Sequence, residues 1–306
     1  MQKSGEKSAF IAIVGRPNTG KSSILNAMLG QKVAIVSPKP QTTRTRIMGI
    51  HTDGEIQLVF VDTPGLHLPK DRLGESMVKA VGEGLRDAEV CVLVVDANVR
   101  RDANGEIIIP AAETELVTRF GQSRQRAILA LNKTDTVKNK KDLLSVIAAY
   151  SKMYDFDEII PLSARKGDNI PRLLEQLYKY AVPSPHFFDE DALTDQPQRV
   201  LAAEILREKL LYLLDREIPH GLAVSVEKYA EREGILDIEM VIYCEKASHK
   251  GIIIGKGGEK LKRVGELSRR DVERFMGTKV FLQTWVKVKE NWRDSQTLLN
   301  NFGFRK

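Results

Sequence analysis

The sequence predicts an α/β domain with a mostly parallel sheet, followed by a smaller α+β domain. Short β-branched runs alternate with helix-length amphipathic segments up to about residue 181, and near-continuous apolar strands joined through helices are typical of a parallel sheet covered on both faces. After a break rich in proline and acidic residues, a helix and two alternating strands begin a different pattern. A chain of 306 residues with 42% hydrophobic content is long enough for two domains with their own cores.

The elements of the first domain follow from its apolar runs. The predicted strands lie at 10–15, 46–51, 55–62, 90–96, 126–133 and 158–164. The run at 46–51 is expected to be an edge strand that pairs with the next strand. The predicted helices lie between the strands, at 21–29, 74–88, 111–120, 141–154 and 170–181.

The second domain begins after residues 182–197, where the periodicity is lost. We therefore expect a first domain at 1–182, a linker at 183–197 and a second domain at 198–306. Its expected order is α-β-β-α-β, followed by a short closing helix. These elements lie at 198–219, 221–232, 235–245, 259–276, 279–292 and 294–302, and a glycine loop directly precedes the helix at 259–276.

Positive charge is concentrated near the C-terminus. Residues 246–306 hold 15 Lys and Arg against 6 Asp and Glu, a net charge of +9, whereas the formal charge of the whole chain is only +6. A basic segment on a mildly acidic body indicates a module that binds a polyanion. The alternative is a well-solvated basic face without a specific partner.

The cysteines and the N-terminus indicate a reducing compartment. Cys91 and Cys244 are the only cysteines, and both lie in apolar runs, so neither a disulfide framework nor a zinc site is expected. The N-terminus lacks the apolar core of a signal peptide, and no run reaches the ~18 apolar residues of a membrane span. We expect a cytoplasmic protein, for which peripheral contact with a membrane stays open.

The stretch GRPNTGKSS is the first candidate site. It fits the pattern G-x-x-x-x-G-K-[ST], directly after a predicted strand and before a predicted helix, as a phosphate-binding loop requires. Its backbone N–H groups are expected to surround the phosphates of a nucleotide, Lys21 to reach the β- and γ-phosphates, and Ser22 to bind Mg²⁺. The expected loop residues are Gly15, Arg16, Pro17, Asn18, Thr19, Gly20, Lys21, Ser22 and Ser23.

Three further motifs at predicted strand ends indicate a guanine nucleotide. DTPG places Asp62 beside Ser22 at the Mg²⁺ ion and the Gly65 N–H near the γ-phosphate. In NKTD, the carboxylate of Asp135 accepts both the N1–H and the exocyclic amine of guanine, and Asn132 bonds O6 or N7; adenine lacks these donors. SARKG supplies a backbone N–H to O6, most readily from Ala164. Lys133, Ser163 and Arg165 complete the predicted nucleotide site.

Taken together, these motifs resemble the nucleotide-binding elements of the translation-factor-like GTPases. The segment 37–46 between them offers a switch hydroxyl for Mg²⁺, and either Thr42 or Thr43 could supply it. Leu66 follows Gly65 where small signalling GTPases have a glutamine that orients water, so slow unaided hydrolysis is expected. Asn18 either caps the loop or holds a K⁺ ion near the phosphates, as in the potassium-stimulated branch that this combination resembles.

The second glycine-rich stretch, GIIIGKGGEK, differs from the first. Gly251 and Gly255 are one position too close for a phosphate loop, and Gly257 stands where Ser or Thr should be. The four residues from 255 to 258 match instead the G-x-x-G turn of a KH domain, which holds a nucleic-acid backbone beside an apolar groove. Residues 252–254 are expected to line that groove. The predicted RNA contacts are Ile254, Gly255, Lys256, Gly257, Gly258, Lys260, Lys262 and Arg263.

The two tryptophans are weaker candidates for RNA contacts. Trp285 and Trp292 could stack on bases, although Trp285 lies in an alternating strand, a position more typical of a core. The histidines show no metal-binding spacing. Residues 98–110 carry no motif that indicates a role.

The pair of domains resembles the bacterial Era family of GTPases over nearly the whole chain. The motifs that carry this resemblance are GRPNTGKSS, QTTRTR, DTPGL, NKTD, SARKG and IIIGKGG. The resemblance implies a P-loop GTPase domain followed by a type II KH domain, GTP or GDP with Mg²⁺, and a KH contact to small-subunit (16S) ribosomal RNA near its 3′ end. It also implies a role in 30S subunit maturation and peripheral membrane association. The alternative is a GTPase that acts on another RNA, in tRNA modification or large-subunit assembly.

Overall fold

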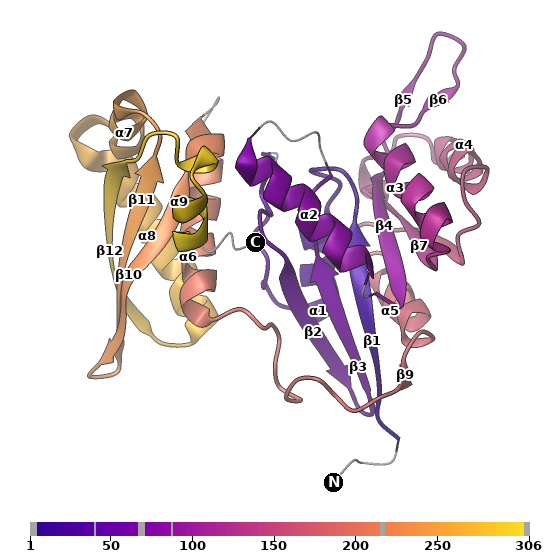
Figure 1. Cartoon of the computed structure of the whole chain (residues 1–306), viewed down its shortest axis with the longest axis horizontal. Helices are drawn as coiled ribbons and strands as arrows, with labels where there is room; N and C mark the ends of the chain where they lie inside the picture. Colours follow the sequence, from indigo (N-terminus) through magenta and orange to yellow (C-terminus); the bar gives the residue numbers. More distant parts are fainter. Residues whose placement is uncertain (1–4, 40, 67–70, 87, 215–217, 303–306) are drawn as a thin grey trace. The chain divides into compact units, whose positions relative to one another are not determined.

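The structure is a computed structural model that describes residues 5–39, 41–66, 71–86, 88–214 and 218–302 (Figure 1). It divides into two compact units. The first comprises the described parts of Met1–Val33, Thr43–Leu68 and Met77–Asp195. The second comprises the described parts of Ala34–Thr42, Pro69–Ser76 and Gln196–Lys306.

The first unit is built on a seven-stranded sheet with the order β2-β3-β1-β4-β7-β8, and β9 pairs with β1. Strands β3, β1, β4, β7 and β8 run parallel, whereas β2 is antiparallel to β3 and β9 is antiparallel to β1. The strands are β1 (Lys7–Val14), β2 (Ile47–Asp53), β3 (Ile56–Asp62), β4 (Val90–Asp96), β7 (Ala127–Asn132), β8 (Glu158–Pro161) and β9 (Val182–Pro183). The predicted mostly parallel sheet and its edge strand are confirmed.

Five helices and a short 3₁₀ turn connect these strands. They are α1 (Lys21–Leu29), α2 (Arg72–Arg86), α3 (Ala111–Ser123), η1 (Thr134–Thr136), α4 (Lys140–Ser151) and α5 (Ile170–Tyr178). Residues of β4 and β7 are almost completely buried, as expected of strands covered on both faces. The motif-free segment 98–110 contains a small hairpin of β5 (Arg100–Arg101) and β6 (Ile107–Ile108), which projects beyond the sheet (Figure 1).

The segment that was expected to be a linker is bonded to the first unit for most of its length. The side-chain oxygen of Gln57 on β3 accepts the N–H groups of Phe187 and Phe188 at 2.8 and 3.1 Å. The Thr194 hydroxyl donates to the Met48 carbonyl of β2 at 2.6 Å. Residues up to Asp195 are therefore held along the strands of the first unit.

The second unit contains a three-stranded sheet with the order β10-β11-β12, in which β10 is antiparallel and β12 parallel to the central strand. Its elements are α6 (Gln198–Leu213), η2 (Ile218–Gly221), β10 (Ala223–Arg232), β11 (Ile235–Cys244), α7 (Ala247–Ile254), η3 (Lys256–Gly258), α8 (Glu259–Met276), β12 (Lys279–Val288), η4 (Trp292–Asp294) and α9 (Gln296–Asn301). The α+β prediction is confirmed, but the predicted order lacked one helix, α7.

Three local expectations in this unit were wrong for reasons of packing. Ile253, expected to line an RNA groove, is fully buried in the core because it lies on the inner side of α7. Trp292, offered as a base-stacking residue, is also fully buried, and its indole N–H donates to the Gly221 carbonyl at 3.0 Å. Trp285, for which a core position was favoured, is 43% exposed.

The described helices include none that is both long and apolar enough to cross a bilayer.

Candidate nucleotide and RNA sites

The predicted phosphate loop lies between β1, which ends at Val14, and α1, which begins at Lys21. Lys21 is buried, and its Nζ donates to the carbonyls of Gly15 and Arg16 at 3.2 and 2.9 Å. Burial lowers the pKa of Lys21 to about 8, although the nearby Asp62 carboxylate opposes this shift. The ammonium group is therefore incompletely compensated by protein, and an anion such as a phosphate would stabilise its charged form.

Ser22 and Thr43 converge on the buried carboxylate of Asp62 at the end of β3. The Ser22 hydroxyl donates to Asp62 Oδ2 at 2.7 Å and lies 2.9 Å from Thr43 Oγ1, which is 3.4 Å from the same carboxylate oxygen. Burial raises the pKa of Asp62 to about 6, and Lys21 and the two hydroxyl hydrogen bonds oppose the shift. These are hard oxygen donors of the kind that Mg²⁺ prefers.

A metal ion fits this donor set because one oxygen of the carboxylate has no protein partner. Asp62 Oδ1 is buried and makes no hydrogen bond to the residues that the structure describes. Leaving a buried carboxylate oxygen without a partner costs free energy in a folded protein, and a cation would remove that cost.

The geometry distinguishes the two threonines that the sequence left equivalent. Thr43 lies at the Ser22–Asp62 pair, as described above. The hydroxyl of Thr42 instead donates to the Lys39 carbonyl at 2.6 Å and lies 2.9 Å from the Ser37 hydroxyl. Of the two, only Thr43 reaches the carboxylate.

Gly65 approaches the phosphate loop so closely that a side chain would not fit. A Cβ at this position would lie 2.5 Å from the backbone nitrogen of Pro17. The next residue, Leu66, is 4% exposed and packs in the core, and its backbone N–H donates to the Gly15 carbonyl at 3.2 Å. Position 66 therefore offers only an apolar, buried side chain, where small signalling GTPases have a glutamine that orients water.

The NKTD and SARKG motifs meet the phosphate loop at the carboxyl ends of β7 and β8. Asn132 joins all three segments, because its Nδ2 donates to the Thr19 carbonyl at 2.8 Å and its Oδ1 accepts the Ala164 N–H at 3.0 Å. The Ser163 hydroxyl donates to Asp135 Oδ1 at 2.8 Å. The Asn132 amide and the Ala164 N–H, both predicted to contact guanine, bond to each other here.

The remaining predicted residues lie around this junction. Lys133 Nζ donates to the Asn18 carbonyl and to Asp96 Oδ2, both at 2.7 Å. Asn18 has a left-handed backbone with φ of 64°. Ser23 lies in the first turn of α1, and Arg165 is exposed in the loop after β8.

Sequence reasoning missed one residue of this site, Glu113 on α3. Its carboxylate is fully buried, and Oε1 lies 2.5 Å from Nε of Arg16 in the phosphate loop. Its Oε2 accepts a hydrogen bond from the Tyr150 hydroxyl of α4. A signal was available, because Glu113 shares one helical face with the apolar residues Leu116 and Phe120, and an acid on such a face needs a buried partner.

The second candidate site begins at the turn between α7 and α8. Gly255 has φ of 76°, and a Cβ there would lie 2.7 Å from Cβ of Lys260, so glycine is required on both counts. Gly257 and Gly258 also have positive φ. The residues from 255 to 258 therefore form a tight exposed turn of the kind that holds a nucleic-acid backbone.

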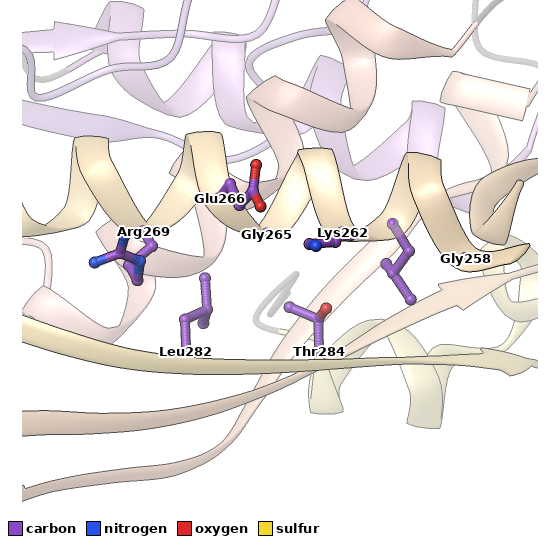
Figure 2. A pocket seen from close by; sticks show the side chains of 8 residues that line it. Gly258, Lys262, Gly265, Glu266, Arg269, Leu282 and Thr284 are labelled. Atoms are coloured by element: carbon purple, nitrogen blue, oxygen red, sulfur yellow. The ribbon is translucent and has the colours of Figure 1, made fainter.

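A groove of about 430 Å³ runs beside this turn, between α8 and β12 (Figure 2). Figure 2 shows Lys262 and Arg269 extending from the helix, opposite Leu282 and Thr284 on the strand. The lining residues are Gly258, Leu261, Lys262, Gly265, Glu266, Arg269, Leu282 and Thr284. Gly265 lines the groove without a side chain, and a Cβ at this position would meet nothing within 4 Å, so the groove is open here.

Two of the predicted RNA contacts, Gly258 and Lys262, line this groove. Lys256 and Arg263 are exposed near it, and Lys260 is half-buried. Ile254, in contrast, packs against the core. Sequence reasoning placed the groove at residues 252–254. In the structure, one wall of the groove is instead formed by residues 261, 265 and 269, which are spaced four apart on one face of α8.

Comparison with known proteins identifies both units. Residues 10–133 match the family model described as 50S ribosome-binding GTPase, and residues 217–293 match that of the KH domain. The chain is 46% identical over 300 residues to the GTPase Era of Ruminiclostridium cellulolyticum, covering 98% of each chain. It is also 46% identical to the GTPase Era of Clostridioides difficile, covering 97% of this chain and 98% of that one.

Two solved structures are similar over almost the whole chain. One is Era of Aquifex aeolicus bound to GDP and AlF4⁻, and the other is Era in complex with MgGDPNP and nucleotides 1506–1542 of 16S ribosomal RNA. Each is 36% identical with a TM-score of 0.91, and the match covers 98% of this chain and 100% of that chain.

Proposed function

The chain belongs to the Era family of GTPases, and from this premise we propose that it is a GTP-hydrolysing switch that binds 16S ribosomal RNA near its 3′ end and assists maturation of the 30S subunit. The observation that carries the proposal is that one chain holds both sites. A phosphate loop tied to Asp62 and Asn132 lies in one unit. A G-x-x-G turn beside a basic groove lies in the other.

In the proposed nucleotide site, Lys21 and the N–H groups of the loop bind the phosphates, and Asp135 selects guanine. Ser22, Thr43 and Asp62 would hold Mg²⁺, with Thr43 preferred to Thr42 because it reaches the carboxylate. When bound, Mg²⁺ neutralises charge on the β- and γ-phosphates. Since Leu66 cannot orient water, hydrolysis is slow until another group positions the nucleophile.

The proposal includes a K⁺ ion held by Asn18 near the phosphates. What supports it is the resemblance to potassium-stimulated GTPases and the fixed backbone of Asn18, whose carbonyl accepts a bond from Lys133. We expect faster GTP turnover in K⁺ than in Na⁺, and loss of that difference in Asn18→Ala. Equal turnover of the unaltered protein in the two salts would contradict the K⁺ site.

In the proposed RNA site, the turn at 255–258 holds the backbone while bases enter the groove between α8 and β12. Lys256, Lys262 and Arg263 neutralise phosphates near the turn. The related Era structure contains MgGDPNP together with 16S RNA, so we expect the GTP form to be the RNA-binding form. The buried free cysteines, Cys91 and Cys244, support a cytoplasmic location, and family resemblance supports peripheral membrane contact.

The proposed target is tested by crosslinking the protein to RNA in cells and sequencing the attached fragments. We expect an enrichment of reads at the 3′ end of 16S RNA. The enrichment should be lost when Lys256→Glu and Lys262→Glu are combined, and kept in the control Lys152→Glu, which reverses an exposed charge in the first unit. Enrichment of transfer RNA or large-subunit RNA instead would favour the alternative target.

A further inference from the structure

The sheet of the second unit has a face that helices α6, α7 and α8 do not cover. Residues of β11 and β12 with even numbers, such as Ile238 and Val286, belong to a buried core that also includes Leu206 of α6, Ile253 of α7 and Val264 of α8. Successive residues of a strand point to opposite faces. The residues with odd numbers on β11 and β12 therefore point away from these three helices.

Strand β12 presents a regular series of side chains on this second face. They are Lys279, Phe281, Gln283, Trp285 and Lys287. Phe281 is 54% exposed and Trp285 is 43% exposed, which is unusual for large aromatic side chains. We call this series the β12 platform.

Only part of the second face is covered by other residues of the unit. At one end, the ring of Phe302 packs against Tyr243 of β11, with the ring centroids 4.8 Å apart. At the other end, Ile235 pairs in register with Lys279 and is 44% exposed. In the described sheet, β12 bonds to β11 alone, so it is an edge strand and its platform can be reached from the side.

The charge of the platform favours a polyanion. Lys279 and Lys287 lie at its two ends, and β12 contains no acidic residue. The acids of the neighbouring strand on the same face, Asp237 and Glu239, lie 2.5 and 3.3 Å from the ammonium group of Lys228. Lys228 offsets only one of these two negative charges, but together with Lys279 and Lys287 the five groups carry a net charge of +1. A phosphate near β12 would therefore meet mainly the two lysines of the platform.

We propose that the β12 platform is a second RNA-binding surface, on which bases of a single strand stack on Phe281 and Trp285 while Lys279 and Lys287 contact phosphates. Aromatic side chains on an open sheet face stack bases in several RNA-binding folds. The amide of Gln283 lies between the two rings in the series and can bond to base edges. This inference rests on the proposed RNA groove and extends it to the other side of the same strand.

The two surfaces are close enough to share one strand of RNA. Leu282 and Thr284 of β12 line the groove, and their chain neighbours 281, 283 and 285 form the platform. An RNA strand that leaves the groove and passes the free edge of β12 therefore reaches the platform.

The experiment compares short and long RNAs on the full-length protein. The short probe is a segment of about ten nucleotides from the 3′ end of 16S RNA, and the long probes carry about ten added uridines at its 5′ or 3′ end. With the unaltered protein, at least one long probe should bind more tightly than the short one. Combining Phe281→Ala and Trp285→Ala should weaken binding of that long probe about tenfold or more and leave binding of the short probe unchanged.

Matched variants separate the platform from the groove. Tyr212→Ala removes an aromatic side chain that is 53% exposed on α6, and should leave binding of both probes unchanged. Gly265→Leu, which fills the groove, should weaken both probes. If the unaltered protein bound neither probe, the RNA groove itself would be wrong. Two other results would contradict the platform alone. One is that the unaltered protein binds the long probes no more tightly than the short probe. The other is that the platform double variant still binds a long probe more tightly than the short one.

Tryptophan fluorescence gives a direct readout of the stacking. Trp292 is buried, so quenching by a stacked base should come from Trp285. The long probe should quench the fluorescence of the unaltered protein but not that of Trp285→Phe. Because this variant keeps a ring for stacking, it should bind the long probe within a few-fold of the original affinity. Quenching that persists in Trp285→Phe would overturn the proposal. Unchanged urea midpoints will show that the variants are folded.

Discussion

At the scale of single residues, we propose that Asp135 selects the base, and the Ser163 hydroxyl holds its carboxylate through a hydrogen bond of 2.8 Å. Asp135→Asn replaces one of the two accepting oxygens with an amide that donates, so guanine keeps at most one of its two bonds to this side chain and meets a donor in place of the other acceptor. We expect GTP to bind roughly 100-fold more weakly or worse, and XTP, which has a carbonyl where guanine has its amine, to bind more tightly than GTP. Nucleotide titrations check this, with exposed Asp142→Asn as the control.

A result in which Asp135→Asn bound GTP as tightly as the unaltered protein would place the guanine contact elsewhere. The same titrations with ATP should show weak binding by both proteins, because adenine lacks the N1–H and the amine that a carboxylate accepts.

Glu113 is predicted to position the phosphate loop through Arg16. Glu113→Gln removes the charge that Arg16 meets and leaves Tyr150 with a weaker acceptor in a buried site. We expect a loss of about 1–3 kcal/mol in the free energy of unfolding, together with weaker nucleotide binding. Urea denaturation and nucleotide titration measure the two effects.

The matched control for this prediction is Glu115→Gln on the same helix. Glu115 makes an exposed pair with Arg119, with 47% of its side chain accessible, so its loss should cost less than about 0.5 kcal/mol. A double-mutant cycle between Glu113→Gln and Arg16→Met should show coupling in nucleotide affinity. Additive effects would mean that Glu113 does not act through Arg16.

Sequence reasoning marked the candidate nucleotide-site residues that lie in contiguous motifs and did not mark contacts that depend on folding. The phosphate-loop pattern marks Lys21 and Ser22 by spacing alone. The choice between Thr42 and Thr43 depends on which hydroxyl the chain brings to Asp62, about 20 residues away, and spacing cannot decide it. Glu113 was missed because its partner Arg16 lies almost 100 residues earlier in the chain.

At the scale of elements, the width of the groove depends on the absence of a side chain at Gly265 of α8. Gly265→Leu should fill part of the groove and weaken RNA binding at least about tenfold, because nothing lies within 4 Å of the new Cβ except the groove space itself. RNA titration of the folded variant measures this. Unweakened binding would mean that bases do not enter the groove.

The control is a smaller residue at the same position. Gly265→Ala should keep most of the RNA affinity and increase the free energy of unfolding by roughly 0.5–1 kcal/mol, since alanine favours a helix interior over glycine. Thermal unfolding of both variants separates the effect on the helix from the effect on the groove.

The elements that periodicity predicted are those with a clear apolar face or run, such as β4 and α8. Helix α7 was missed because its sequence, ASHKGIII, contains a glycine and three β-branched isoleucines, which favour a strand or loop locally. Tertiary packing decides this case, since Ile253 contributes to the core of the second unit. The same packing reversed the expected roles of Trp285 and Trp292.

At the scale of the whole molecule, the number and class of the domains could be predicted from where the alternation of strands and helices stops. The attachment of residues up to Asp195 to the first unit could not, because it depends on single hydrogen bonds such as that between Gln57 and Phe187. A segment rich in proline and acid has no periodic signal that would reveal such bonds.

The central claim for the whole molecule is that the nucleotide bound in the first unit controls RNA binding by the second. Such control requires that RNA bind the two nucleotide states with different affinities, because a ligand with equal affinity for both shifts neither. The most direct measurement is the Kd for the 3′-end segment of 16S RNA with GDP and with a non-hydrolysable GTP analogue. The account predicts binding at least about fivefold tighter with the analogue, a coupling of roughly 1 kcal/mol, and equal Kd values would contradict it.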